Sequence, residues 1–228
     1  MTKTASSSAQ ESSGAPHMDY EALYRGESPG EGMAPMPTPP WDTKAPNENV
    51  IAWQTGGWIH GDVLDAGCGL GDNSVYLAEN GHQVTGLDIS PTALITAEQR
   101  AKDAGVAVKF AVADSTKLDG YTNAFDTVID SGLVHCLDDD GRRSYAAAVH
   151  RATRPGATLL LSCFSDANPA GGEWPRPAVS EATLRDVLGS AGWDILSLEP
   201  ATVRGALDDG PQADMGFWYL RAQRRYVT

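Results

Sequence analysis

Residues 62–90 have the sequence DVLDAGCGLGDNSVYLAENGHQVTGLDIS, which predicts a strand, a glycine-rich loop, a helix and a second strand. The apolar start of this stretch is typical of a buried strand. Gly67, Gly69 and Gly71 allow a tight turn and let the backbone approach a ligand closely. Asp88 ends the second strand, where a carboxylate can accept hydrogen bonds from both hydroxyl groups of a ribose. The stretch therefore predicts a βαβ unit that binds a nucleotide.

A second carboxylate, Asp65, indicates which kind of nucleotide this unit binds. Asp65 stands two residues before the first glycine, where it would repel the pyrophosphate of a dinucleotide such as NAD. The glycines also follow the pattern G-x-G-x-G rather than G-x-G-x-x-G. A carboxylate in this place suits the cationic amino group of S-adenosylmethionine, whose sulfonium is also positive. A nicotinamide oxidoreductase stays open as an alternative.

Strand and helix patterns alternate through the rest of the chain, which predicts an α/β fold. We expect a Rossmann-like, doubly wound and mostly parallel seven-stranded sheet in a single domain. The strands are expected at residues 62–66, 84–87, 106–113, 124–130, 157–163, 193–198 and 216–223. Helices are expected at residues 19–25, 48–55, 73–80, 91–105, 141–152 and 180–188. In such a sheet the ligand binds beyond the carboxyl ends of the strands.

Three segments are expected along the chain. Residues 1–17 are small and polar, so they are expected to form a disordered tail. Residues 18–57 are expected to form a cap or lid, because they contain the proline- and glycine-rich stretch GESPGEGMAPMPTPP, and long irregular loops of this kind are often functional. Residues 58–228 form the expected Rossmann-like core.

The composition argues against several classes of partner. With 30 acidic and 17 basic residues, the 228-residue chain has a net charge of −13, which disfavours nucleic acid and anionic membranes. Its three cysteines form no C-x-x-C pair, so disulfides and zinc are not expected and a reducing compartment is. No apolar run approaches the roughly 18 residues that span a bilayer, and no secretory signal is visible. We expect a cytoplasmic protein without a metal, and leave monomer and homodimer open.

Two further carboxylates, Asp114 and Asp130, also stand at the expected carboxyl ends of strands. Asp130, with Ser131, is expected beside the methionine part of the cofactor, although the pair could simply end the strand. His135 lies five residues beyond Asp130, close to where a methyl acceptor must sit. A histidine with a pKa of about 6.5 can remove a proton from the acceptor at neutral pH, so His135 is the candidate base. A structural histidine at a helix start is the alternative.

Aromatic and sulfur-containing side chains are concentrated in the segments expected to overhang the site. Tyr24 and Trp41 could close over the cofactor, because aromatic rings exclude water and attract a sulfonium. The remaining side chains suit a planar apolar acceptor. They are Tyr20, Met33, Met36, Phe164 and Trp174. All of these side chains could instead fill the cap's own core.

The glycine loop with its two carboxylates resembles class I S-adenosylmethionine-dependent methyltransferases. The strings LYRGESPGEGMAPM, PPWDTKAP, FDTVIDSG and SCFSDAN are similar to those of small bacterial methyltransferases of heterocyclic toxins, which act on 2-alkyl-1-hydroxyquinolin-4-ones. These enzymes belong to the branch that also holds thiopurine, thiol and halide methyltransferases. One departure is that the chain has DSGL where enzymes acting on exocyclic amines have an (N/D)PP(Y/F) motif, which disfavours nucleic-acid bases.

The resemblance implies a role for each cofactor ligand. Asp65, Gly67 and Gly69 would hold the methionine part, Asp88 the ribose, and Asp114 with Ser115 the adenine; Ile89 is placed with these ligands. The expected activity is methyl transfer to the hydroxyl oxygen of a hydroxyquinolone, phenol or quinol, with detoxification as the expected role. The alternatives are a thiol or halide methyltransferase and, in a different class, a module that binds S-adenosylmethionine without catalysis.

Overall fold

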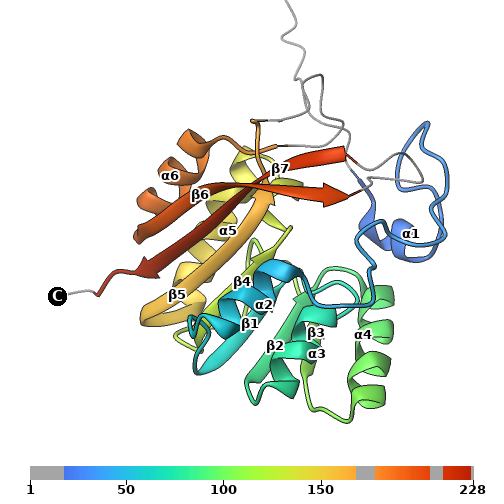
Figure 1. Ribbon diagram of the computed structural model, residues 1–228, viewed down its shortest axis with the longest axis horizontal. Helices are drawn as coiled ribbons and strands as arrows, with labels where there is room; N and C mark the ends of the chain where they lie inside the picture. Colours follow the sequence, from blue (N-terminus) through green and yellow to red (C-terminus); the bar gives the residue numbers. More distant parts are fainter. Residues whose placement is uncertain (1–17, 168–177, 206–212, 227–228) are drawn as a thin grey trace, which may run out of the picture.

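A seven-stranded sheet forms the centre of the computed structural model, which describes residues 18–167, 178–205 and 213–226 (Figure 1). The strand order is β3-β2-β1-β4-β5-β7-β6. The strands β1 to β5 run parallel, whereas β7 is antiparallel to both of its neighbours. The strands are β1 (Asp62–Ala66), β2 (Gln83–Asp88), β3 (Lys109–Val112), β4 (Phe125–Ser131), β5 (Thr153–Phe164), β6 (Trp193–Gly205) and β7 (Ala213–Arg224). The predicted fold class is therefore confirmed.

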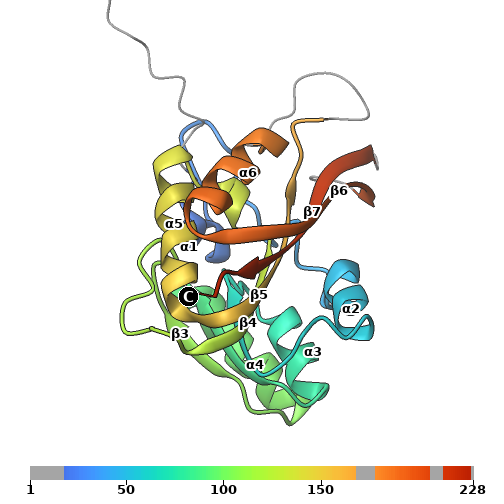
Figure 2. The same ribbon diagram turned by 90° about the vertical axis from the view of Figure 1, so that its left-hand side faces the viewer.

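Helices cover both faces of this sheet (Figure 2). They are α1 (Tyr20–Tyr24), α2 (Glu48–Thr55), α3 (Asp72–Glu79), α4 (Pro91–Ala104), the 3₁₀ helix η1 (Val134–Cys136), α5 (Asp139–Ala152) and α6 (Glu181–Ser190). Alternate residues of β5 show the two-sided core, because Leu159 and Leu161 pack with α5 and α6, whereas Leu160 packs with α2 and α3. Strands buried on both faces need such near-continuous apolar runs.

The helix boundaries follow the local signals in the sequence. Ser90 caps α4 by accepting a hydrogen bond from the Ala93 amide, Pro91 takes the first helical position, and Gly105 ends the helix with a left-handed backbone. Helix α3 begins after Gly71, whose φ is +84°. A Cβ atom at Gly71 would lie 2.7 Å from the Cβ of Ala97, so the close contact of α3 with α4 requires glycine there.

Four strands differ from the prediction by more than one residue at one end. Strand β3 begins at Lys109 rather than at residue 106, because its ladder with β2 starts at the pair Thr85 and Lys109. Strand β5 begins earlier, at Thr153, because this residue pairs with Phe125 across an irregularity in the ladder. Strands β6 and β7 pair from Trp193–Arg224 out to Gly205–Ala213. The paired strands therefore extend past residues 193–198 and 216–223, where the apolar pattern predicts them.

Other expectations lie wholly or partly outside what the structure describes. The expected disordered tail, residues 1–17, and the candidate acceptor residue Trp174 belong to the parts of the chain that are not described. Within the described ranges, no helix is long and apolar enough to cross a membrane. The same ranges contain no group of three or more histidine, cysteine or acidic side chains that could hold a metal ion.

Candidate active site

The glycine loop follows β1 and folds back onto the end of β2. The amides of Gly67 and Cys68 both donate to the carbonyl oxygen of Leu87, at 2.8 and 3.0 Å. The amide of Gly69 donates to Oδ2 of Asp88 at 2.8 Å. A Cβ atom at Gly69 would lie 2.8 Å from the hydroxyl oxygen of Tyr24. The loop and the Asp88 carboxylate therefore form one unit, and the glycine leaves the room that Tyr24 needs above it.

Asp88 is buried at the carboxyl end of β2, and its carboxylate is held from two sides. Oδ2 accepts the Gly69 amide, and Oδ1 accepts the Ser90 amide at 2.9 Å. Burial raises its pKa, and these backbone hydrogen bonds oppose the rise. Each carboxylate oxygen has a second lone pair, so both can still accept a ligand hydroxyl. The neighbouring Ile89 is 61% exposed at this edge, where an apolar ring could cover it.

Asp65 is buried beneath the glycine loop. Its Oδ2 accepts a hydrogen bond of 2.6 Å from the hydroxyl of Ser74 in α3. The pKa of Asp65 is raised to about 7, mainly by burial; the Ser74 hydrogen bond opposes this rise, and the charges of Asp88 and Asp130 add to it. A cluster of buried carboxylates favours a ligand with positive charge, because a nearby cation stabilises the ionised form.

Asp130 and Ser131 make contacts inside the protein. The carboxylate of Asp130 is fully buried, and its Oδ1 accepts the amides of Leu133 at 2.8 Å and Val134 at 3.4 Å. It therefore fixes the start of η1, which carries His135. The hydroxyl of Ser131 accepts a hydrogen bond of 2.7 Å from the side-chain amide of Asn47, the residue directly before α2 in the chain. Contact of either residue with the cofactor stays a prediction.

Asp114 and Ser115 lie in the turn that follows β3. Oδ1 of Asp114 accepts the amide of Thr116 at 2.9 Å, and Oδ2 pairs with Lys117 at 2.9 Å. These interactions, led by the hydrogen bond from the Thr116 hydroxyl, lower the pKa of Asp114, so it is ionised at neutral pH. Ser115 is buried beside it. The turn lies beyond β3, next to the end of β2, and its contact with adenine stays a prediction.

The cap brings three of the predicted aromatic residues together. The indole N–H of Trp41 donates to the hydroxyl oxygen of Tyr24 at 3.1 Å. The Trp41 ring lies 6.1 Å from the ring of Tyr24 and 6.2 Å from that of Tyr20, between centroids. Burial raises the pKa of Tyr24, and the charge of Asp88 adds to this rise. Met33 and Met36 are half-buried in the same cap.

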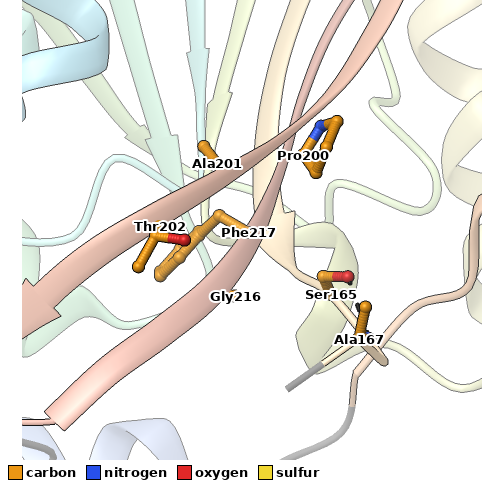
Figure 3. Close-up of a pocket in the computed structure, with 7 residues that line it drawn as sticks. All are labelled: Ser165, Ala167, Pro200, Ala201, Thr202, Gly216 and Phe217. Carbon is orange, nitrogen blue, oxygen red and sulfur yellow. Dashed lines mark hydrogen bonds between the residues drawn. The ribbon is translucent and has the colours of Figure 1, made fainter. Parts of the chain in front are cut away.

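A line of rings connects His135 to Phe217 in β7. The ring of Phe164 lies 4.6 Å from that of His135 and 4.6 Å from that of Phe217. Phe217 belongs to an open pocket of about 300 Å³ at the carboxyl end of β5 (Figure 3). The pocket is lined by Ser165, Ala167, Pro200, Ala201, Thr202, Gly216 and Phe217. Phe217 was not among the predicted site residues, although it lies near the start of a predicted strand.

His135 has a defined hydrogen bond on one ring nitrogen. The backbone amide of Phe164 donates to Nδ1 at 3.3 Å, and the side chain is buried. In a neutral imidazole one nitrogen accepts and the other carries the proton, so this hydrogen bond places the proton on Nε2. In the described arrangement His135 is therefore a hydrogen-bond donor through Nε2. Its action as a base would need the other tautomer.

The order of the strands, the antiparallel seventh strand and the glycine loop between Asp65 and Asp88 define a class I methyltransferase fold. Comparison with known proteins agrees. A family model described as a methyltransferase domain matches residues 63–156. The chain is 36% identical, over 223 residues, to the 2-heptyl-1-hydroxyquinolin-4(1H)-one methyltransferase of Mycobacteroides abscessus. This similarity covers 90% of the chain and 96% of the relative. The chain belongs to the S-adenosylmethionine-dependent methyltransferases.

Solved structures extend the comparison. A chain studied for the conversion of a disulfide bond into a thioacetal group during echinomycin biosynthesis is 38% identical, with a TM-score of 0.80 and 92% of each chain covered. The magnesium protoporphyrin IX methyltransferase of Synechocystis with bound S-adenosylhomocysteine is 24% identical, with a TM-score of 0.61, and covers 78% of this chain and 80% of its own. The second likeness concerns the fold alone.

The residues present fit S-adenosylmethionine, which is the cofactor of this family. The buried carboxylates of Asp65 and Asp88 have their pKa values raised, and a ligand with a cationic amino group and a sulfonium would stabilise their ionised forms. The glycine loop offers a surface without side chains beside them. Asp65 would hold the amino group, and Asp88 would hold the ribose.

The raised pKa of Asp65 predicts that cofactor binding depends on pH. The ionised carboxylate is the form that pairs with a cationic amino group, so protonation of Asp65 competes with binding as the pH falls through about 7. We expect the dissociation constant of S-adenosylhomocysteine to rise about tenfold between pH 7.5 and pH 6. Calorimetry in buffers of different ionisation enthalpy should show proton release on binding. Asp65→Asn should bind more weakly at pH 7.5 and lose most of the dependence; a flat profile in the wild type would contradict the assignment.

Proposed function

We propose that this methyltransferase transfers the methyl group to the hydroxyl oxygen of a small aromatic or heterocyclic molecule of the hydroxyquinolone, phenol or quinol type. The observation that carries the proposal is the 36% identity, across 96% of its length, to a relative named for a 2-heptyl-1-hydroxyquinolin-4(1H)-one. This similarity covers 90% of the chain, so it extends into the cap and into β5 to β7. These are the segments that would surround the methyl acceptor.

The side chains around His135 support a flat apolar acceptor. His135, Phe164 and Phe217 form a continuous line of rings, and the pocket beyond Phe217 is lined mainly by apolar groups. Apolar and aromatic walls with a few polar groups are typical of sites for small heterocycles. A halide ion or a small thiol would leave this line of rings without a role.

His135 is the polar member of this line of rings, and we assign it a donor role. Through Nε2–H it would donate a hydrogen bond to the acceptor oxygen and favour the ionised hydroxyl, whose proton leaves to solvent. S-adenosylmethionine supplies a methyl carbon on a positively charged sulfur, a leaving group that needs no further activation. The protein's main task is then to exclude water and align the acceptor oxygen, which is catalysis by proximity and orientation.

The cellular setting is part of the proposal. A net charge of −13 would repel nucleic acids and anionic membranes, so we infer a freely diffusing enzyme with a small-molecule substrate. Three cysteines without a disulfide fit the reducing cytoplasm. Detoxification of a hydroxylated heterocycle is the role that accords with such a substrate.

A screen of methyl acceptors tests the proposed function. Hydroxyquinolones, phenols, quinols, thiols and halides are compared by the formation of S-adenosylhomocysteine, and the product of each active compound is identified by mass spectrometry. We expect turnover with aromatic hydroxyl compounds and an O-methyl product. Rapid methylation of thiols or iodide, with none of any aromatic hydroxyl compound, would overturn the proposal. Binding of the cofactor without turnover of any acceptor would favour a non-catalytic binding module.

A further inference from the structure

One arginine joins the cap to the glycine loop. Arg100 lies in α4, and its guanidinium pairs with Oδ1 of Asp42 at 2.8 Å and with Oδ2 of Asp72 at 2.5 Å. Asp42 follows Trp41 in the cap. Asp72 is the first residue of α3, directly after Gly71. The three charged groups therefore connect the segment above the cofactor site to the loop that forms its floor.

The environment of these groups makes the connection stronger than a surface ion pair. The Asp42 side chain is 8% exposed, and those of Arg100 and Asp72 are each 21% exposed. By comparison, Arg143 and Asp186 form a pair on the surface with exposures of 57% and 58%. Partly buried charges are screened less by salt, and a planar guanidinium can serve two carboxylates at once. Without Arg100, two partly buried carboxylates would face each other unpaired.

The cap is fastened to the same helix at a second place. Glu21 in α1 accepts hydrogen bonds from the hydroxyls of Ser90 and Thr92, at 2.5 and 2.6 Å. Ser90 and Arg100 are ten residues apart, which corresponds to about 15 Å along a helix. The cap thus contacts α4 and its N-cap through Glu21 and Asp42, and Tyr24 and Trp41 lie between these two residues in the chain.

We propose that Arg100 is a positioning residue that holds the cap closed over the bound cofactor. By binding Asp42 and Asp72 together, it keeps Trp41 hydrogen-bonded to Tyr24, whose hydroxyl lies above Gly69. Arg100 controls how long the cofactor or its product stays bound, through the cap and not through a contact of its own. This inference concerns the cofactor half of the site, so it is independent of which acceptor is used.

Product release tests the inference without any acceptor. The dissociation rate of S-adenosylhomocysteine is measured by stopped-flow tryptophan fluorescence for the wild type, Arg100→Gln, Arg100→Lys and Asp42→Asn. We expect Arg100→Gln and Asp42→Asn to release the ligand about tenfold faster or more, since Asp42→Asn loses one charge-assisted hydrogen bond between partly buried groups and Arg100→Gln loses two. Arg100→Lys should be intermediate, because a single ammonium reaches two carboxylates less well. The surface variant Arg143→Gln is the control and should release the ligand at the wild-type rate.

Trypsin cleavage of the liganded protein gives a second readout. Arg25 and Lys44 are exposed cleavage sites within the cap. A loosened cap should make cleavage there faster in Arg100→Gln, with other sites unchanged. Asp42→Asn keeps the ion pair between Arg100 and Asp72. If Arg100→Gln does not fold, the release rate of Asp42→Asn therefore tests the inference. Wild-type release rates in a folded Asp42→Asn or Arg100→Gln would overturn the inference, and so would equal acceleration in Arg143→Gln or cleavage that increases equally along the chain.

Discussion

Replacement of Asp88 by alanine is expected to weaken the binding of S-adenosylhomocysteine by about 100-fold. Asp88 would accept hydrogen bonds from both ribose hydroxyls, and a hydrogen bond to a charged group contributes roughly 1.5–3 kcal/mol. Two bonds at the lower value give about 3 kcal/mol, or a factor of about 100 in the dissociation constant. Isothermal titration calorimetry measures this constant directly.

Two controls separate the lost contacts from general damage at Asp88. The same carboxylate accepts the amides of Gly69 and Ser90, so its removal also disturbs the loop. Asp88→Asn keeps the side-chain volume and one acceptor oxygen, and should lose less affinity than Asp88→Ala. Asp119→Ala removes an equal charge from an exposed position and should bind normally. An unchanged dissociation constant in a folded Asp88→Ala would show that the ribose lies elsewhere.

Replacement of His135 by alanine is expected to lower kcat by about 10- to 100-fold at neutral pH, the effect of losing one hydrogen bond to a charged acceptor oxygen. The reason is that His135 would favour ionisation of the acceptor hydroxyl by donating from Nε2. The loss should diminish as the pH rises, because the hydroxyl then ionises unaided. The measurement is the pH dependence of kcat with a weakly acidic phenol.

Glutamine at position 135 distinguishes a donor from a base. Its side-chain amide can donate a hydrogen bond but cannot accept a proton at neutral pH. If His135 acts as the donor that its hydrogen bond with Phe164 indicates, His135→Gln should keep most of the activity that His135→Ala loses. Equal losses in both variants would instead support the base that the sequence alone suggests. With a strongly acidic N-hydroxy compound, the effect of either substitution should shrink.

The cap and the pH dependence have a joint consequence for the cofactor. Asp65 becomes protonated near neutral pH in the ligand-free protein. The ion pairs of Arg100 lie in a different part of the site, between the cap and the start of α3. Acidification to about pH 6 should therefore weaken cofactor binding through Asp65. Mutation of Arg100 should speed up release at every pH. The two effects are expected to be separable and to add.

The sequence by itself predicted the βαβ unit that carries the glycine loop, and the helix that follows it. Helix α4, with Ser90 as its cap and Gly105 at its end, was predicted within one residue, because capping signals are local. Asp65, the glycines and Asp88 could be recognised because one continuous βαβ segment carries all of them. Strand ends were less certain, as β3 and β6 show, because a ladder with a neighbouring strand decides where pairing stops.

Only the tertiary structure decided which rings surround His135 and how the cap is held. Phe217 reaches Phe164 because β7 runs antiparallel between β5 and β6, which turns its first residues toward the carboxyl edge of the sheet. Arg100 contacts Asp42, which lies 58 residues away in the chain. The amide of Phe164, 29 residues from His135, determines which ring nitrogen of His135 carries the proton. Contacts of this kind leave no periodic or local signal in the sequence, because they depend on how separate elements pack together.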